Sequence, residues 1–366
     1  MGTSSKKKKL DNEFSFGEAP PTEESNTFDF PNPPIPEPNQ QSVFEPSKHP
    51  FGSIAIPNTS RIKQTWSIGG GKGGVGKSLI ASCLAMSLAR TGNKVICIDL
   101  DLGGANLHSA LGISLPRNTL SDFFTGRASH LADCVSTTNI DNLEIISGAH
   151  DATTAANINN LQKEQLFQKI WDLNADYIVF DLGAGTNLNT LDFFLFTDIG
   201  IITLLPEPTS IENAYRFIKS VYYRRLQVSP RLNIIQPLVE TAMDSKNNQG
   251  IKSPANLFQE VSRAHPESMM QLKKELEKFS PKLILNQART QTDVDIGFSI
   301  KSVVKQYFGV DIDYVGYLDY DSAAWQSIRR KKPLMKEFPN SRIVTNIERI
   351  STYLMRRHSN IRNYLF

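Results

Sequence analysis

The sequence predicts an α/β fold, a doubly wound and mostly parallel sheet flanked by helices. From Thr65 onward, apolar runs of strand length alternate with helix-like segments, which is typical of parallel strands joined by crossover helices. A glycine-rich stretch lies between the first of these strands and the first helix, where open α/β sheets bind ligands. The expected strands are Thr65–Gly70, Lys94–Asp99, Leu143–Ser147, Tyr177–Asp181, Gly200–Leu205, Lys282–Asn286 and Tyr314–Tyr317.

Three helix-like segments stand out in this pattern. Lys77–Thr91 follows the glycine-rich stretch and carries apolar residues at helical spacing. The run Thr209–Glu212 resembles a capping box and predicts a helix over Ile211–Leu226, with Pro208 just ahead of it. An amphipathic stretch, Met269–Phe279, lies in an insert at about 227–281, to which we assign no counterpart.

Residues 1–60 differ in composition from the rest of the chain. They hold half of its 20 prolines and the basic run Lys6–Lys9, so this segment cannot pack a core. We therefore expect a disordered, Pro-rich and basic tail over 1–60. One domain over 61–357 and a short basic and apolar tail over 358–366 are expected to follow.

Composition excludes several classes of protein. The 366 residues are 40% hydrophobic, enough for one large core, and the formal net charge of +3 is too small to indicate nucleic-acid binding by itself. No apolar run is long enough to span a bilayer, so we expect a cytoplasmic protein. The cysteines Cys83, Cys97 and Cys134 lack metal-binding spacing and are expected to be free, mostly buried thiols.

The glycine-rich stretch predicts a phosphate-binding loop. Its eight residues fit G-x-x-x-x-G-K-[ST], in which glycines let backbone N–H groups surround a phosphate at a helix N-terminus. We expect Lys77 to reach the β- and γ-phosphates and the Ser78 hydroxyl to bind Mg²⁺. A second lysine, Lys72, stands near the start of the loop. The loop residues are Gly71, Lys72, Gly73, Gly74, Val75, Gly76, Lys77 and Ser78.

Aspartates at two strand ends supply carboxylates for a metal. Asp181 ends an apolar run, and Asp99 and Asp101 lie at the end of an earlier one. Because the carboxyl ends of parallel strands meet at the ligand-binding edge of a sheet, we expect these aspartates beside the phosphate loop. Mg²⁺ prefers a few oxygen ligands and keeps several waters. The sequence therefore predicts a site for ATP with Mg²⁺.

These motifs resemble the MinD/ParA family of deviant-Walker-A ATPases, which have a P-loop NTPase fold of the SIMIBI type. The resemblance runs from about Thr65 to about Tyr353, outside the insert, and rests on 72–78, 99–106 and 181–185. It implies that Lys72 crosses an ATP-bound homodimer to the other subunit's phosphates. It further implies that Asp101 positions the hydrolytic water and that Asp99 and Asp181 hold Mg²⁺ through water.

The same resemblance extends to three further nucleotide-site residues. Asn106 completes the first switch motif, Asn286 lies where the family reads adenine, and Glu207 lies in a loop near the dimer interface. The segments 316–321 and 327–334 look most like the flagellar-number regulator branch, the FlhG type. That branch's D-Q-A-x-x-L-R activator motif is missing, and Asp319 replaces a usual proline in the base-proximal loop.

The resemblance implies an ATP-dependent dimerising switch. Such a protein hydrolyses ATP slowly, is stimulated by a protein partner such as a flagellar GTPase or an activator, and controls the position or number of a flagellum, division site or similar structure. The apolar and basic residues at the C-terminus suit weak peripheral contact with the inner face of the cell membrane. A terminal helix packed on the domain is the alternative for these residues.

Two other functions remain open. A chromosome or plasmid partition ATPase would bind DNA without sequence specificity, and basic clusters could contact phosphates in that case. A biosynthetic ligase of the same fold would need a substrate pocket beside the phosphates. The basic clusters are Arg216, Lys219, Arg224 and Arg225 on one helix, and the run Arg329–Lys332.

Overall fold

Eight strands form one sheet in the order β3-β4-β2-β5-β1-β6-β7-β8 in a computed structural model that describes residues 62–148, 158–244, 251 and 253–363. Every neighbouring pair is parallel except β3 and β4. The predicted α/β class and all seven predicted strands are confirmed; the short β3 was not predicted. The bounds are β1 Gln64–Gly69, β2 Val95–Leu100, β3 Val135–Thr137, β4 Leu143–Ile146, β5 Tyr177–Leu182, β6 Ile199–Leu204, β7 Lys282–Ala288 and β8 Asp313–Asp319.

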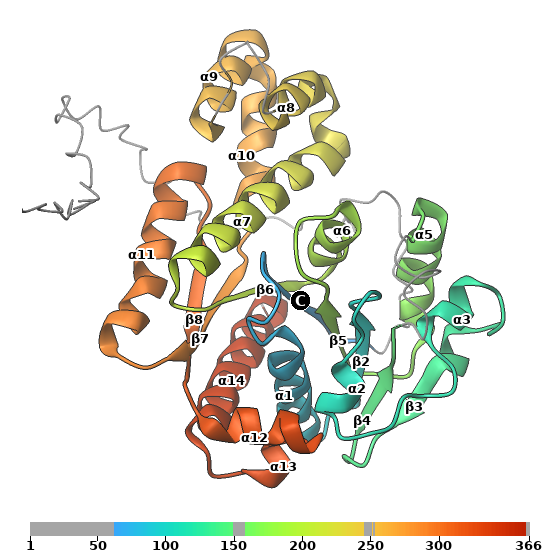
Figure 1. Cartoon of the computed structure of the whole chain (residues 1–366). Helices are drawn as coiled ribbons and strands as arrows, with labels where there is room; N and C mark the ends of the chain where they lie inside the picture. The colour runs from blue at the N-terminus through green and yellow to red at the C-terminus, as the bar shows by residue number, and fades with distance from the viewer. Residues whose placement is uncertain (1–61, 149–157, 245–250, 252, 364–366) are drawn as a thin grey trace, which may run out of the picture. The chain divides into compact units, whose positions relative to one another are not determined.

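Helices cover both faces of the sheet, as a doubly wound fold requires (Figure 1). One buried apolar cluster joins α1 and α14 to the sheet, and a second joins α6, α7 and α11 to the other face. The helices outside the insert are α1 Lys77–Arg90, α2 Leu107–Ala110, α3 Leu120–Phe124, α5 Asn160–Lys169, α6 Leu188–Phe196, α7 Pro208–Val228, α11 Gln291–Phe308, α12 Ser322–Arg330, α13 Leu334–Glu337 and α14 Arg342–Asn363.

Helix α7 begins earlier than predicted, so the expected capping box is wrong. Its N-cap is Glu207, whose side chain makes no capping bond, and Pro208 is the first helical residue. A proline is favoured there because its fixed φ suits the helix and it has no N–H to leave unpaired. The Ser210 hydroxyl instead accepts a hydrogen bond of 2.9 Å from the backbone N–H of Leu205.

The insert adds a group of helices at the C-terminal end of α7 (Figure 1). Its amphipathic stretch is helix α10, as the sequence predicted. Buried apolar residues such as Leu232, Val261 and Leu272 join the insert to the core of the α7 face. Its helices are α8 Gln236–Met243, α9 Pro254–Ala264 and α10 Met269–Glu277, with short 3₁₀ turns at Pro230–Ile235 and Pro266–Ser268.

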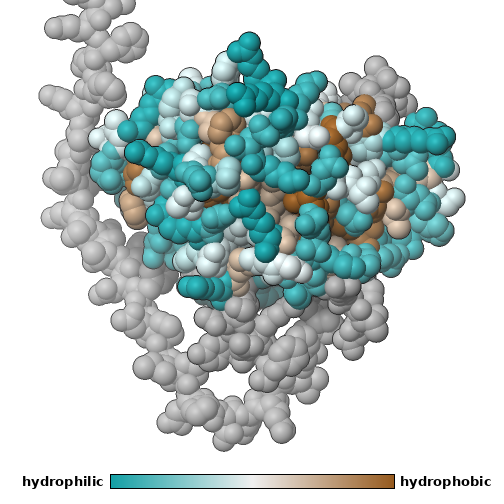
Figure 2. All heavy atoms as spheres, turned by 90° about the horizontal axis from the view of Figure 1, so that it is seen from below, coloured by the Kyte–Doolittle hydropathy of each residue, from teal (hydrophilic) through white to brown (hydrophobic). Residues whose placement is uncertain are grey.

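Of the two predicted tails, 1–60 lies outside the described residues. Helix α14 continues to Asn363, through most of the expected C-terminal tail. None of the described helices is both long enough and apolar enough to cross a bilayer. The face of the molecule in Figure 2 is largely hydrophilic, with apolar side chains in separate patches.

Candidate nucleotide-binding site

The predicted phosphate loop connects β1 to α1 at the carboxyl edge of the central strands. β1 lies between β5 and β6, and the connection from β1 to β2 runs across the sheet in the opposite direction to the connection from β5 to β6. Open α/β sheets bind ligands at such a crevice. Gly76 is the N-cap of α1, and its positive φ of 93° turns the loop into the helix without the strain that a side chain would cause.

Neighbouring elements hold the loop in place on two sides. Asn286, at the end of β7, is buried and donates a hydrogen bond of 2.8 Å from Nδ2 to the carbonyl oxygen of Val75. A Cβ on Gly76 would lie 2.4 Å from that same amide nitrogen. On the other side, a Cβ on Gly71 would lie 2.0 Å from the backbone oxygen of Asn213 in α7. The loop therefore depends on glycine at both positions.

The two lysines of the loop occupy different environments. Lys77 is 7% exposed, and its Nζ donates to the carbonyl oxygen of Lys72 at 3.4 Å. Burial lowers the pKa of Lys77, and the carboxylates of Asp181 and Asp101 oppose that shift. The Lys72 side chain is 39% exposed. One lysine thus points into the loop, and the other lies at its surface.

Asp99 and Asp181 lie side by side on adjacent strands, as the sequence predicted. They are register partners in β2 and β5, and both are fully buried. Asp99 accepts hydrogen bonds of 3.1 Å from the backbone N–H groups of Asp101 and Leu107. Asp181 accepts none that meets hydrogen-bond geometry from a described residue.

Burial disfavours the ionised form of both carboxylates. Burial, opposed by the hydrogen bonds from Leu107 and Asp101, raises the pKa of Asp99 to about 7. Burial and the neighbouring Asp99 raise the pKa of Asp181 well above its ordinary value, although the Ser78 hydroxyl and Lys77 oppose the shift. A hydrated cation would satisfy oxygen atoms that otherwise have no partner. The residues present therefore fit Mg²⁺, which Ser78, Asp181 and Asp99 would hold.

The structure also places the remaining predicted residues. Asp101 follows β2 directly and is half-buried close to Lys77. Asn106 is the exposed N-cap of α2, and its Nδ2 donates to the carbonyl oxygen of Gly104 at 2.6 Å. Asn286 is engaged with the loop, so its side chain supports the phosphate site whether or not it contacts a base.

Two side chains at this edge, Lys72 and Arg289, make contacts that were not predicted from the sequence. The Nζ of Lys72 donates to the Thr209 hydroxyl at 3.1 Å and lies 3.7 Å from the Glu207 carboxylate, both at the start of α7. The guanidinium of Arg289 stacks 4.0 Å from the ring centre of Tyr320 beyond the ends of β7 and β8. The sequence predicted a strand end near residues 286–289. No local sequence pattern, however, pairs Arg289 with Tyr320, which lies 31 positions later.

The basic cluster on α7 does not form one exposed surface. Arg224 makes two hydrogen bonds to the buried Asp192, at 2.7 and 3.1 Å, and Arg225 is paired with Glu275. Arg216 pairs with Glu212 on the same helix at 2.6 Å. Arg224 and Arg225 thus pair with buried carboxylates, whereas Arg216 and Lys219 are exposed, so the four residues do not form one basic surface for nucleic-acid phosphates.

The three cysteines are free and buried, as predicted. Burial raises the pKa of the Cys83 thiol to about 12 and raises that of Cys97 further. A thiol must ionise to act as a nucleophile or metal ligand. These residues therefore belong to the core and contribute nothing to the chemistry of the site.

Comparison with known sequences finds several relatives of this chain. A family model described as an AAA domain matches residues 63–234. The antiactivator FleN of Pseudomonas aeruginosa is 25% identical over 298 residues, which are 81% of this chain and 83% of FleN. The flagellum site-determining protein YlxH of Helicobacter pylori is 35% identical over 151 residues, 41% of this chain and only 50% of YlxH. An ATP-binding protein of Methanocaldococcus jannaschii is 30% identical over 188 residues, 51% of this chain and 67% of that protein.

Solved structures share the fold. The septum site-determining protein MinD of Pyrococcus horikoshii, solved with Mg-ADP, superposes with a TM-score of 0.56 at 21% identity, covering 80% of this chain and 95% of MinD. The structural similarity therefore covers the whole sheet as well as the phosphate loop. With its phosphate loop, second lysine and paired strand-end aspartates, the chain belongs to the MinD/ParA family of P-loop ATPases, close to the FlhG-type flagellar regulators.

Proposed function

We propose that this protein is an ATP-dependent dimerising switch whose slow hydrolysis of ATP controls the number or position of a flagellum or a similar cellular structure. The observation that carries the ATPase part is the buried pair Asp99 and Asp181 beside Lys77, with two carboxylate oxygens of Asp181 unpaired. The flagellar part rests on the similarity to FleN along most of both chains. The second candidate function is placement of the division site, and it rests on the structural similarity to MinD.

The side chains of this site divide the work of phosphoryl transfer. Lys77 would neutralise charge on the phosphates, and Ser78, Asp181 and Asp99 would hold the cation, which neutralises further phosphate charge when bound. Asp101, half-buried at the end of β2, accepts a hydrogen bond from the attacking water and orients it. Bound ATP with Mg²⁺ supplies the phosphoanhydride that is cleaved.

Lys72 is the residue that makes the reaction depend on a second subunit in this proposal. Its side chain lies at the surface, and its two contacts on α7 are with exposed groups, so leaving them has a small energetic cost. A cation delivered in trans to the transferred phosphate is worth on the order of 10³–10⁵ in rate. Glu207 and Thr209 would hold the lysine in the monomer and release it on dimerisation.

Substitution of this lysine tests the switch. We expect Lys72→Ala to retain nucleotide binding through Lys77 but to lose both ATP-dependent dimers, measured by light scattering, and ATP hydrolysis. The matched control is Lys305→Ala, an exposed lysine on α11 away from the site, which should leave both unchanged. Hydrolysis at the unaltered rate in Lys72→Ala would exclude the trans-lysine mechanism.

Asp101→Ala separates binding from hydrolysis. Without the carboxylate that orients water, the ATP-bound dimer should form and persist, so light scattering with ATP should give a stable dimer and phosphate release should fall by at least tenfold. The trapped dimer would then serve as bait for the protein partner, a flagellar GTPase or an activator. A monomer under these conditions would contradict the proposed role of Asp101.

A further inference from the structure

A second pocket lies at the opposite edge of the sheet from the phosphate loop. It encloses about 270 Å³ where β6 and β7 begin, and it is roofed by Lys278, Phe279 and Ser280 at the end of the insert. The strands run parallel to β1, whose far end carries the phosphate loop. A six-residue strand is about 20 Å long, so the two sites are separated by the full depth of the sheet.

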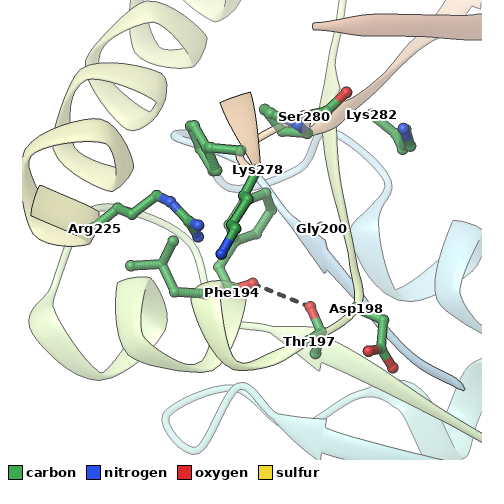
Figure 3. Close-up of a pocket in the computed structure, with 11 residues that line it drawn as sticks. Phe194, Thr197, Asp198, Gly200, Arg225, Lys278, Ser280 and Lys282 are labelled. Carbon is green, nitrogen blue, oxygen red and sulfur yellow. Dashed lines mark hydrogen bonds between the residues drawn. The ribbon is translucent and has the colours of Figure 1, made fainter. Parts of the chain in front are cut away.

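Two cations converge in this pocket. Figure 3 shows Arg225 from α7 and Lys278 from the segment after α10 reaching toward one another, with the Phe194 ring beneath them. Lys278 is exposed and forms no ion pair with a described carboxylate, whereas Lys282 is buried and paired with Asp313 at 3.4 Å. Two positive charges that line the same pocket repel each other, and an anion between them would remove the repulsion.

The nearby carboxylates are already engaged. Glu275 lies between Arg225 and Arg231, at 3.5 and 3.3 Å, so one carboxylate serves two arginines. Asp198, the acidic residue of the pocket wall, accepts hydrogen bonds from the backbone N–H and the hydroxyl of Thr65 at 2.8 and 3.0 Å. The lining residues carry three positive charges and one negative charge, and no carboxylate neutralises Lys278.

The other walls of the pocket are apolar. Phe194 and Phe279 are 2% and 6% exposed, and the Arg225 guanidinium lies 5.6 Å from the ring centre of Phe279. The Phe194 ring packs directly against Gly200, where a Cβ would lie 2.5 Å from the ring. A ligand would therefore meet a charged rim and an aromatic base, the usual composition of a small-molecule site.

We propose that this pocket binds a small phosphate monoester that carries an aromatic or apolar group. The phosphate lies between the Arg225 guanidinium and the Lys278 ammonium, where charge-assisted hydrogen bonds are strongest. The apolar group rests on Phe194 and Phe279. The site is distinct from the phosphate loop and exists only because the insert closes it, which gives a function to the segment that the ATPase site leaves unexplained.

Calorimetric titration of the full-length protein with phenyl phosphate tests the proposal. Lys278→Glu reverses one charge on an exposed side chain and should weaken binding at least tenfold. The matched control is Lys274→Glu, the same change at an exposed lysine of α10 that does not line the pocket, and it should bind as the unaltered chain does. Inorganic phosphate should bind more weakly than phenyl phosphate, because it leaves the aromatic wall uncovered.

A variant of the phosphate loop distinguishes the two sites. If phenyl phosphate occupies the proposed pocket, Lys77→Ala should leave its affinity unchanged. Equal affinity in Lys278→Glu and the unaltered chain would overturn the proposal, and loss of binding in Lys77→Ala alone would place the ligand in the phosphate loop instead. Absence of measurable binding at millimolar phenyl phosphate would overturn it as well.

Discussion

Two aspartates with equal burial have opposite roles in this molecule. Asp181 and Asp192 are both fully buried, but Asp192 is surrounded by the cations Lys163 and Arg224, whereas Asp181 has no hydrogen-bond partner among the described residues and faces Asp99. A buried charge is tolerated when it is paired and is costly when it is not. The ion pairs of Asp192 therefore stabilise the fold, whereas the burial of Asp181 has a cost in stability that no ion pair of this kind offsets.

This contrast predicts stability changes of opposite sign. Because the pKa of Asp181 is raised, its ionised form is disfavoured in the folded protein, and Asp181→Asn should stabilise the nucleotide-free protein by about 1–3 kcal/mol. Asp192→Asn leaves Lys163 and Arg224 without their carboxylate and should destabilise it by about 3–5 kcal/mol. Urea unfolding at pH 7.5 measures both. Destabilisation by both variants would contradict the assignment of Asp181 as an unpaired, functional carboxylate.

The same Asp181→Asn variant should lose Mg²⁺-dependent ATP binding. The neutral amide cannot order the waters of a cation as a carboxylate does, so fluorescence titration with a labelled ATP should show little difference with and without Mg²⁺. A variant that is both more stable and still Mg²⁺-dependent would place the metal elsewhere.

At the scale of elements, the phosphate loop shows how one turn is fixed by its neighbours. Sequence reasoning predicted the strand, loop and helix because the glycine spacing and apolar runs are local signals. It missed the hydrogen bond from Asn286 to the loop and the start of α7 at Pro208. It also missed the contact of Lys72 with Thr209, which lies 137 positions later. Those features depend on where distant segments meet after folding, which no local pattern records.

Alanine substitution of two glycines in the phosphate loop tests whether the packing of Asn286 against the loop requires glycine. Gly76→Ala would add a methyl group 2.4 Å from the Asn286 amide at a φ of 93°, so we expect thermal unfolding at a temperature several degrees lower and loss of ATP binding. Gly73→Ala adds the same group where no heavy atom lies within 4 Å, and its unfolding temperature should be close to that of the unaltered chain. Equal unfolding temperatures would show that the loop does not need glycine at position 76.

At the scale of the whole molecule, two buried clusters on opposite faces of one sheet account for the accuracy of the predicted fold. Buried central strands such as β2 and β5 are largely apolar runs that the sequence reveals directly. β3 has three residues, none of them buried, and gives no such signal. The packing of the insert was equally hidden, because amphipathic helices indicate a buried face without indicating what covers it.

The core itself predicts how stability depends on pH. The Cys83 thiol keeps its proton up to about pH 12 in the folded protein, because it is buried, but ionises near pH 9 once unfolded. The pKa of buried Cys97 is raised in the same direction. Above pH 9 the unfolded state therefore binds fewer protons than the folded state, and the free energy of unfolding falls as pH rises, by up to about 1.4 kcal/mol per pH unit for each thiol.

Urea unfolding at intervals from pH 7.5 to 10.5 should show this decline, and Cys83→Ala, which removes one titrating group, should show a shallower one. Parallel curves for the two proteins would mean that Cys83 is not buried in the folded core.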